Sequence, residues 1–313
     1  MGDFLHKAQR GLFAHIDWFL IASAVSISLL GLITMHSYAG DNNYFDKQMF
    51  WIALAVLVFF AATLVDYQFL RRTPVVTTIF ICTALALALV FVFGHVAQGA
   101  QSRFNLGLFA IQPADPAKLV LVILLAKYFA RRHIEIAHIR HILVSGAYTL
   151  ILCGLVFFQP DFGSAIIIAS IWLGMVLVAG ISWKHLATLL CIGLVVAGGV
   201  WHYGLRPYQK ERILTFIHPL ADIQGAGYNA YQATIAIGSG EAVGKGIGYG
   251  TQSKLRFLPE YQTDFIFAAY AEEWGFFGVL LLFGLFAIVI IRTLVLARGA
   301  GGNDASVNGV RAE

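Results

Sequence analysis

Eight apolar segments dominate this sequence of 313 residues and restrict it to membrane folds, and the fourth is short for a span. A helix needs about 20 predominantly apolar residues to cross a bilayer, and backbone groups cannot stay unpaired in lipid. The segments are residues 18–37, 49–65, 74–96, 117–130, 142–158, 162–179, 186–203 and 264–291. The sequence therefore predicts an all-α polytopic membrane protein with about eight transmembrane helices and a long extracytoplasmic loop before the last.

Composition supports a membrane protein and argues against other classes. Of all residues, 59% are hydrophobic and 12% charged, with a mean hydropathy of +0.76. Soluble domains average about 45–50% apolar and about 25% charged residues. The net charge of +4 is modest and no basic tract suggests nucleic-acid binding. Cys82, Cys153 and Cys191 lie inside apolar segments without the spacing of a disulfide framework or a metal site.

The basic residues predict how the chain is oriented. With the N-terminus in the cytoplasm, the short outer loops carry only Lys47 and Arg103, which agrees with the positive-inside rule. The cytoplasmic segments then carry Lys7, Arg10, Arg71, Arg72, Arg131, Arg132, Arg140, Lys184, Arg292 and Arg298. Residues 204–262 form the long outer loop, where we expect the active surface because long ordered loops are commonly functional. The transmembrane bundle is expected over residues 1–292, followed by a flexible polar cytoplasmic tail, 293–313.

Carboxylates near membrane depth are rare, because an unpaired buried charge costs about 2.5–3.5 kcal/mol on insertion scales. This chain has five such residues: Asp115, Asp161, Asp264, Glu272 and Glu273. Asp264 heads the last segment, where small and acidic residues follow at helical spacing: Ala268, Ala271, Glu272 and Gly275. Such a face suits close packing or a cavity.

The two aspartates at segment starts have two interpretations. Asp161 and Asp264 each stand where a side chain caps a helix. Alternatively, one of the carboxylates is a general base whose pKa is raised by low-dielectric surroundings. A structural salt bridge is likewise the simplest role for Asp115 and Lys118, which are three residues apart.

Basic and glycine-rich parts of the long loop are candidates to bind an anion. Lys210 and Arg212 either meet phosphates at headgroup level or extend to the interface without a specific ligand. The stretch GSGEAVGKGIGYG from Gly238 is not a P-loop, because Gly246 follows Lys245 where Ser or Thr is required. Its glycines are expected to permit positive φ and close backbone approach, and its amides are candidates to face a phosphate.

Three histidines lie close together in sequence between the fourth and fifth segments. His133, His138 and His141 fall in a predicted cytoplasmic loop rich in arginine, with Glu135 as the only nearby carboxylate. We interpret them as a solvated basic loop, and no metal site is assigned.

Several motifs together resemble one membrane-protein family. They are RPYQKERILTFIHP from Arg206, GAGYNAYQATIAIGSG from Gly225, GKGIGYGTQSKLRFLPEYQTDFIFA from Gly244, AEEWGFFG from Ala271 and QPDFGSA from Gln159, with a weaker match in FAIQPADPAK from Phe109. In this combination the chain resembles the SEDS proteins (shape, elongation, division and sporulation), which include RodA, FtsW and SpoVE. The segment GTQSKLRFLPE is most similar to the RodA group.

The resemblance implies an inverting glycosyltransferase that polymerises the cell-wall precursor lipid II on the outer face of the bacterial cytoplasmic (inner) membrane, during wall elongation and rod-shape maintenance. It implies that Asp264 deprotonates the acceptor hydroxyl and that Asp161 is a second important carboxylate. Lys210 and Arg212 would hold the donor pyrophosphate. A divalent cation, Mg²⁺ or Mn²⁺, is a candidate to share that task, although no ligand spacing identifies a site.

The resemblance also implies roles for residues in two weaker positions. Asp115 and Lys118 occupy the Glu and Lys positions of a QPSE-type motif and would form a cavity-lining ion pair that binds substrate. Asp115 is one methylene shorter than the usual Glu, and Pro116 replaces an apolar residue, which changes the local helix geometry. Glu272 is a further expected substrate-binding residue.

Family members normally continue through about two more helices that carry a PLPFxSYGGS-like motif. Here the sequence after Ile291 turns polar and rich in glycine, so we expect a chain that lacks these helices. The usual partners would be a class B penicillin-binding transpeptidase, other elongation-complex membrane proteins, lipid II and undecaprenyl-linked glycan.

Two other functions stay open from the sequence. Intramembrane acidic and basic residues also mark flippases of lipid-linked precursors and small-solute transporters. The charges here gather toward one face and one long loop, which favours interfacial chemistry over transport. A non-catalytic scaffold of the elongation complex is the third interpretation.

Overall fold

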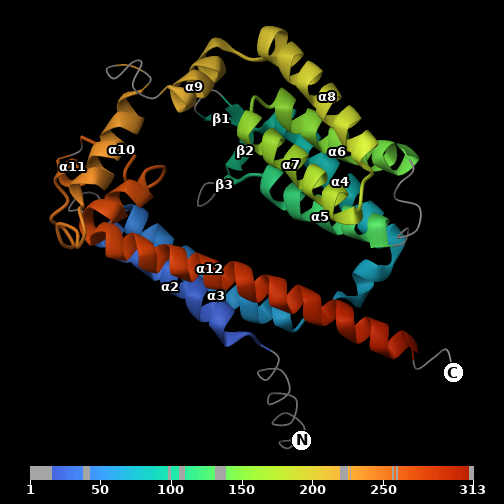
Figure 1. The fold of residues 1–313 in the computed structure, drawn as a ribbon, viewed down its shortest axis with the longest axis horizontal. Helices are drawn as coiled ribbons and strands as arrows, with labels where there is room; N and C mark the ends of the chain where they lie inside the picture. The colour runs from blue at the N-terminus through green and yellow to red at the C-terminus, as the bar shows by residue number, and fades with distance from the viewer. Residues whose placement is uncertain are drawn as a thin grey trace, which may run out of the picture. The chain divides into compact units, whose positions relative to one another are not determined.

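The structure is a computed structural model that describes residues 16–37, 43–97, 100–105, 110–130, 139–218, 225, 227–255, 257–258 and 260–309 (Figure 1). Side chains are outside the description at residues 43, 95–102, 208, 212 and 300–309. The chain divides into two compact units. One comprises Met1–Val65 and Leu205–Glu313, and the other comprises Asp66–Gly204.

Each of the eight apolar segments contains a helix. The helices are α2 (Trp18–Ser37), α3 (Asn43–Thr63), α4 (Thr73–Phe93), α5 (Ala114–Ala130), α6 (Ile139–Phe158), α7 (Phe162–Ala179), α8 (Trp183–Gly199) and α12 (Ile266–Gly309). In the described part of the chain, seven helices are long and apolar enough to span a membrane. The exception is α5, which has 17 residues and carries Asp115, Lys118 and Lys127. The prediction of a polytopic helical membrane protein is confirmed.

The unit Asp66–Gly204 is a packed group of helices around one apolar core. α5 contacts α4 and α7, and α6 contacts α7 most extensively. Leu87, Leu121, Leu125, Leu152 and Ile168 are completely buried at their interface. The unit also contains a 3₁₀ helix, η1 (Tyr67–Arg71), and a π-helical turn, η2 (Val200–Gly204), which continues α8. Most other apolar side chains of these helices face outward, as expected for surfaces that meet lipid.

A small sheet in the described residues departs from the all-helical prediction. β1 (His95–Ala97), β2 (Ala100–Asn105) and β3 (Ala110–Ile111) pair antiparallel in the order β1-β2-β3. The register places His95 opposite Arg103 and Phe104 opposite Ile111. The strands lie between α4 and α5, and their pairing satisfies backbone groups of a connection that is not helical.

The other unit contains α2, α3 and α12, together with three helices of the long loop: α9 (Pro207–Ile217), α10 (Tyr228–Ser239) and α11 (Thr251–Lys254). α2 lies between α3 and the long α12, and it packs most extensively on α12 (Figure 1). An ion pair joins these two helices at one end, where Arg292 Nη2 lies 2.7 Å from Asp17 Oδ2. The hydrogen bond from Arg292 holds the pKa of Asp17 below its usual value.

α12 is broken at Gly275, where φ is 65° and ψ is −164°. The sequence predicted one continuous span over residues 264–291, so this break was missed. The glycine-rich stretch pairs with the backbone on both sides of it. Lys245 N and Gly246 N donate to Glu272 O and Glu273 O at 3.0 Å, while Phe276 N and Phe277 N donate to Glu241 O at 2.9 Å and Ala242 O at 3.1 Å. Non-helical backbone in a membrane protein requires such protein partners.

The pairing depends on two glycines with positive φ. At Gly244 φ is 80°, and an added Cβ would overlap the carbonyl oxygen of Glu273. At Gly275 an added Cβ would overlap the amide nitrogen of Gly244. The expected close backbone approach of the glycine-rich stretch is therefore confirmed, and its partner is α12.

α12 is helical to Gly309, beyond Ile291, where the last predicted span ends. The boundary proposed at residue 292 thus falls inside this helix. The flexibility of residues 293–313 stays a prediction.

We predict that Gly244→Ala destabilises the protein, because the methyl group meets backbone that cannot move independently. The expected loss is about 2 kcal/mol or more, seen as a lower midpoint of thermal unfolding in detergent. Gly284→Ala is the matched control, since nothing lies within 4 Å of a Cβ at that helical position. Equal losses in both variants would show that close approach is not what requires glycine at position 244.

Candidate active site

The seven predicted site residues divide between the two units. Lys210, Arg212, Asp264 and Glu272 belong to the unit that contains α12. Asp115, Lys118 and Asp161 belong to the other unit. Within one unit Asp115 pairs with Lys118, and Asp161 caps a helix and also binds Gln112. Within the other, Glu272 binds Lys245, and Asp264 makes no hydrogen bond or ion pair with the other predicted site residues that are described.

Asp264 lies at an exposed position in the turn that leads into α12. Thr263 N and Phe265 N both donate to Glu260 O at 3.1 Å, and Glu260 has a φ of 49°. Before the turn, Leu258 is completely buried in an apolar cluster with Ala233, Ala236 and Ala268. These contacts hold the backbone around Asp264.

The carboxylate of Asp264 has no hydrogen bond or ion pair with the described part of the chain. It does not cap α12, because that helix begins two residues later, at Ile266. The capping interpretation of Asp264 is therefore wrong. The side chain is also exposed, so the described residues do not supply the low-dielectric surroundings suggested for a general base.

Glu272 is completely buried at the centre of a polar cluster. Lys245 Nζ lies 2.9 Å from Oε1, which also accepts from Thr251 Oγ1 at 3.1 Å and from Gln252 N at 3.0 Å. Ser253 donates to Oε2 from its N at 3.4 Å and from its Oγ at 3.3 Å. Glu272 thus binds the chain's own loop, and its contact with substrate stays a prediction.

Glu273 is the second buried acid of α12, with 1% of its surface exposed. Ser37 Oγ and Gly248 N donate to its Oε1, the latter at 2.7 Å. Ser37 is the last residue of α2, so Glu273 ties that helix end to the glycine-rich stretch. The predicted face of small and acidic residues is confirmed as a packing face, with Ala268 and Ala271 also buried.

Asp161 is the N-cap of α7, as the capping interpretation predicted. Its Oδ1 accepts from Ser164 N at 3.1 Å. Its Oδ2 accepts from Gln112 Nε2 at 2.8 Å, and the Gln112 carbonyl accepts from Arg103 Nε at 3.2 Å. Gln112 precedes α5, so both carboxylate oxygens hold structure within one unit. Sequence reasoning missed Gln112, although it stands in the QPADPAK motif.

Asp115 and Lys118 form the predicted ion pair on the first turn of α5, with Asp115 Oδ1 at 2.9 Å from Lys118 Nζ. The Asp115 side chain is 66% exposed and that of Lys118 24%. Neither residue lines the cavity of about 300 Å³ beside Pro113 and Pro116. The structural interpretation of this pair is confirmed, while its contact with substrate stays a prediction.

Lys210 lies on α9, half-buried. The helix begins with Pro207 at its first turn, and Gln209 Oε1 accepts from Arg206 N at 2.9 Å. This capping gives α9 a defined start at the base of the long loop. Arg212 is on the same helix, and its side chain is outside the description.

The amides of the glycine-rich stretch were considered as phosphate ligands, but the structure gives them other partners. Lys245 N, Gly246 N and Gly248 N donate to Glu272 O, Glu273 O and Glu273 Oε1. They are therefore engaged by α12 and do not face a phosphate. Sequence reasoning missed the partner of Lys245. The position of this single lysine among glycines was the one feature of the sequence that could have indicated a specific role.

His141 corrects the interpretation of the histidine cluster. It lies on α6, is 4% exposed, and its Nδ1 is 2.9 Å from Tyr128 Oη. His133 and His138 lie outside the described residues. Across the part of the chain that is described, no group of three His, Cys, Asp or Glu residues could hold a metal ion.

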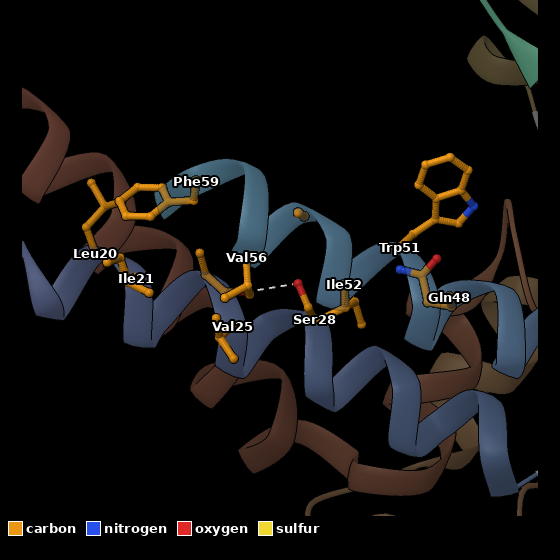
Figure 2. Close-up of a pocket in the computed structure, with 11 residues that line it drawn as sticks. Leu20, Ile21, Val25, Ser28, Gln48, Trp51, Ile52, Val56 and Phe59 are labelled. Atoms are coloured by element: carbon orange, nitrogen blue, oxygen red, sulfur yellow. Dashed lines mark hydrogen bonds between the residues drawn. The ribbon is translucent and has the colours of Figure 1, made fainter. Parts of the chain in front are cut away.

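A cavity of about 390 Å³ lies between α2 and α3 (Figure 2). Its lining is apolar except for Ser28 and Gln48, and Trp51 and Phe59 contribute the largest side chains. None of the seven predicted site residues lines it. It is therefore separate from the candidate active site.

A family model described as "Cell cycle protein", for FtsW, RodA and SpoVE, matches residues 10–308. The chain belongs to this family. It is 34% identical over 308 residues to the probable peptidoglycan glycosyltransferase FtsW of Bacillus subtilis (strain 168), which covers 90% of this chain and 74% of the relative. The predicted membership of the SEDS proteins is confirmed.

Two solved structures are similar in fold to this chain. A chain from a structure on the coordination of polymerization and crosslinking by a peptidoglycan synthase complex matches with a TM-score of 0.74 and 31% identity, over 90% of this chain and 78% of that one. RodA of Thermus thermophilus matches with a TM-score of 0.63 and 27% identity, over 91% and 76%. Proteins named FtsW and RodA are thus both similar to this family member.

For this family member we predict that Asp161→Ala lowers the free energy of unfolding by about 1 kcal/mol, through loss of the α7 cap. Asp161→Asn retains an oxygen that accepts from Ser164 N but loses the acceptor for Gln112 Nε2, so it should be destabilised less than Asp161→Ala. Thermal unfolding of the purified variants measures the difference. Equal destabilisation by both substitutions would contradict the capping role and point to the bond from Gln112 or to the negative charge.

Proposed function

We propose that this chain is a peptidoglycan glycosyltransferase that polymerises lipid II during wall elongation. Membership of the FtsW/RodA/SpoVE family and similarity to a probable peptidoglycan glycosyltransferase support the reaction class. The observation that carries the proposal is the Asp264 carboxylate, which is exposed on a constrained turn. A carboxylate that has no partner among the described residues remains available to accept a proton from a substrate.

In the proposed reaction Asp264 accepts the proton of the acceptor GlcNAc 4-hydroxyl. The hydroxyl oxygen then forms a bond to C1 of the donor MurNAc, and the bond from C1 to the phosphate oxygen breaks. Undecaprenyl pyrophosphate leaves with both electrons of that bond, and the anomeric centre is inverted. The contribution of a positioned base to such a step is about 10²- to 10⁴-fold.

Basic residues of the long loop would hold the departing pyrophosphate. Lys210 lies on the capped helix α9, and Arg212 follows on the same helix. Ammonium and guanidinium groups make charge-assisted hydrogen bonds to phosphate oxygens. We assign no step to Mg²⁺ or Mn²⁺, because the described acidic residues form no cluster of three that fits a cation.

We propose supporting roles for Asp161 and the Asp115–Lys118 pair within their own unit, Asp66–Gly204. Both carboxylate oxygens of Asp161 accept hydrogen bonds from the chain itself. We therefore propose that Asp161 fixes the start of α7 beside Gln112. The exposed Asp115 retains the capacity to contact a polar substrate group.

The proposed setting is the bacterial inner membrane, with the N-terminus in the cytoplasm and residues 204–262 outside. Seven helices suited to spanning support a multi-pass membrane protein, and the basic residues favour this orientation. A class B penicillin-binding transpeptidase is the proposed partner. The similar chain from a complex that coordinates polymerization and crosslinking supports that pairing.

The test is glycan synthesis from labelled lipid II by the purified chain together with its cognate transpeptidase. We expect polymer from the parent and at least about 100-fold less from Asp264→Asn, because the amide cannot accept the proton. Glu241→Gln is the matched control, since it neutralises another exposed carboxylate of the same unit. Its polymer yield should equal that of the parent.

Other results would replace the proposal. Equal polymer from the parent and Asp264→Asn would remove Asp264 as the base. No polymer from any folded variant would favour a scaffold, or a flippase if labelled lipid II instead crosses the bilayer of reconstituted vesicles.

A further inference from the structure

The side chain of Glu272 is bound by residues of its own chain. Its carboxylate is completely buried and accepts hydrogen bonds from Lys245, Thr251, Gln252 and Ser253, and a longer one from Ser239 Oγ at 3.5 Å. Gln252 and Ser253 contribute backbone amides, so the carboxylate fixes the path of the chain as well as side chains. Buried carboxylates are tolerated when they are paired and hydrogen-bonded in this way.

Lys245 is the cation of this cluster. Its Nζ lies 2.9 Å from Glu272 Oε1 and donates to Thr251 Oγ1 at 2.8 Å. Its backbone amide donates to Glu272 O. Lys245 is thus bound to the same residue of α12 through both its main chain and its side chain, although it is 27 residues away in sequence.

Two members of the cluster, Thr251 and Glu272, mark the two ends of a piece of chain that contains Asp264. α11 begins at Thr251, which contacts Glu272, and the chain then passes through the buried Leu258 to the turn at Glu260. Asp264 follows, and Glu272 lies about two helical turns into α12. The bonds to Glu272 therefore close this piece of chain into a loop that starts and ends at one carboxylate.

We propose that the Lys245–Glu272 pair is a positioning element for Asp264, which rests on the function proposed above. We call Lys245, Thr251, Gln252, Ser253 and Glu272 the loop latch. The latch holds the start of the 251–265 segment against α12, so that the Asp264 carboxylate stays where the acceptor hydroxyl arrives. A misplacement of about 1 Å in a catalytic group can lower a rate about 100-fold, so a latch remote from substrate can control the chemical step.

Lys245→Met tests the latch with little change in side-chain volume. Removal of the ammonium leaves the buried Glu272 carboxylate with neutral donors only, which loosens the cluster. We expect the polymerisation rate at saturating lipid II to fall about tenfold to 100-fold, with the half-saturating lipid II concentration within about twofold of the parent. Lys245→Arg keeps a cation and should restore the rate to within about threefold.

Arg292→Met is the matched control on the same helix. It breaks the ion pair to Asp17, further along α12 than Glu272, and should lower the thermal midpoint without changing the rate per folded molecule. Thr251→Val is a milder latch variant, for use if Lys245→Met does not fold. It removes one hydroxyl that joins Lys245 to Glu272, and a rate about threefold lower is expected.

Hydrogen exchange measures the latch independently of activity. Amides of residues 245–255 should exchange at least about tenfold faster in Lys245→Met than in the parent or in Arg292→Met. Unchanged exchange would overturn the latch. Faster exchange with an unchanged polymerisation rate would show that Asp264 does not depend on it.

Two further outcomes also decide against the inference. A rate loss in Arg292→Met as large as that in Lys245→Met would reduce the latch to general stability. A folded parent that makes no polymer would overturn the proposed function and the catalytic role of the latch, while the exchange comparison would still show whether Lys245 holds the loop.

Discussion

The break in α12 at Gly275 is the constraint on which the arrangement of the long loop depends. A helix that spans a membrane satisfies its own backbone, and any interruption leaves polar groups that lipid cannot pair. Here the glycine-rich stretch supplies donors to Glu272 O and Glu273 O and acceptors to Phe276 N and Phe277 N. The loop is consequently part of the transmembrane unit and not an appendage to it.

The side chains of Glu272 and Glu273, just before the break, add hydrogen bonds to those made by the backbone. Glu272 collects donors from α11 and its preceding loop, while Glu273 joins the end of α2 to Gly248. Each carboxylate is buried, and each is bound to residues distant in sequence. Their burial is stabilising only because the partners are present together, so the loop, the broken helix and α2 are expected to order cooperatively.

The turn before α12 presents an exposed carboxylate, that of Asp264, on a backbone that is held by its neighbours. The buried Leu258 and the bonds to Glu260 O hold the backbone, whereas Asp264 itself stays exposed. This combination suits interfacial chemistry, in which a base must be accessible to a lipid-linked sugar and yet held in place. Asp161 shows the opposite case, since its two oxygens already accept hydrogen bonds within the fold.

The sequence alone predicted the long apolar helices and the residue types of the candidate site, but not the helices α9, α10 and α11 of the long loop. α2 and α7 were predicted with their bounds, because the length and apolarity of a span are local properties set by transfer from water to lipid. The motifs also identified Asp161 and Asp264, each followed by phenylalanine and each at the start of an apolar segment. From the local sequence pattern, each of these aspartates could be either a helix cap or a general base.

Only the tertiary structure decided between those interpretations. Asp161 caps α7 because that helix begins at the next residue, whereas Phe265 N donates to Glu260 O and delays α12 until Ile266. The break at Gly275, the Lys245–Glu272 pair and the Ser37–Glu273 bond were equally absent from any local pattern. They join residues 27 and 236 positions apart, and such contacts exist only when the folded chain brings buried polar groups within hydrogen-bonding distance.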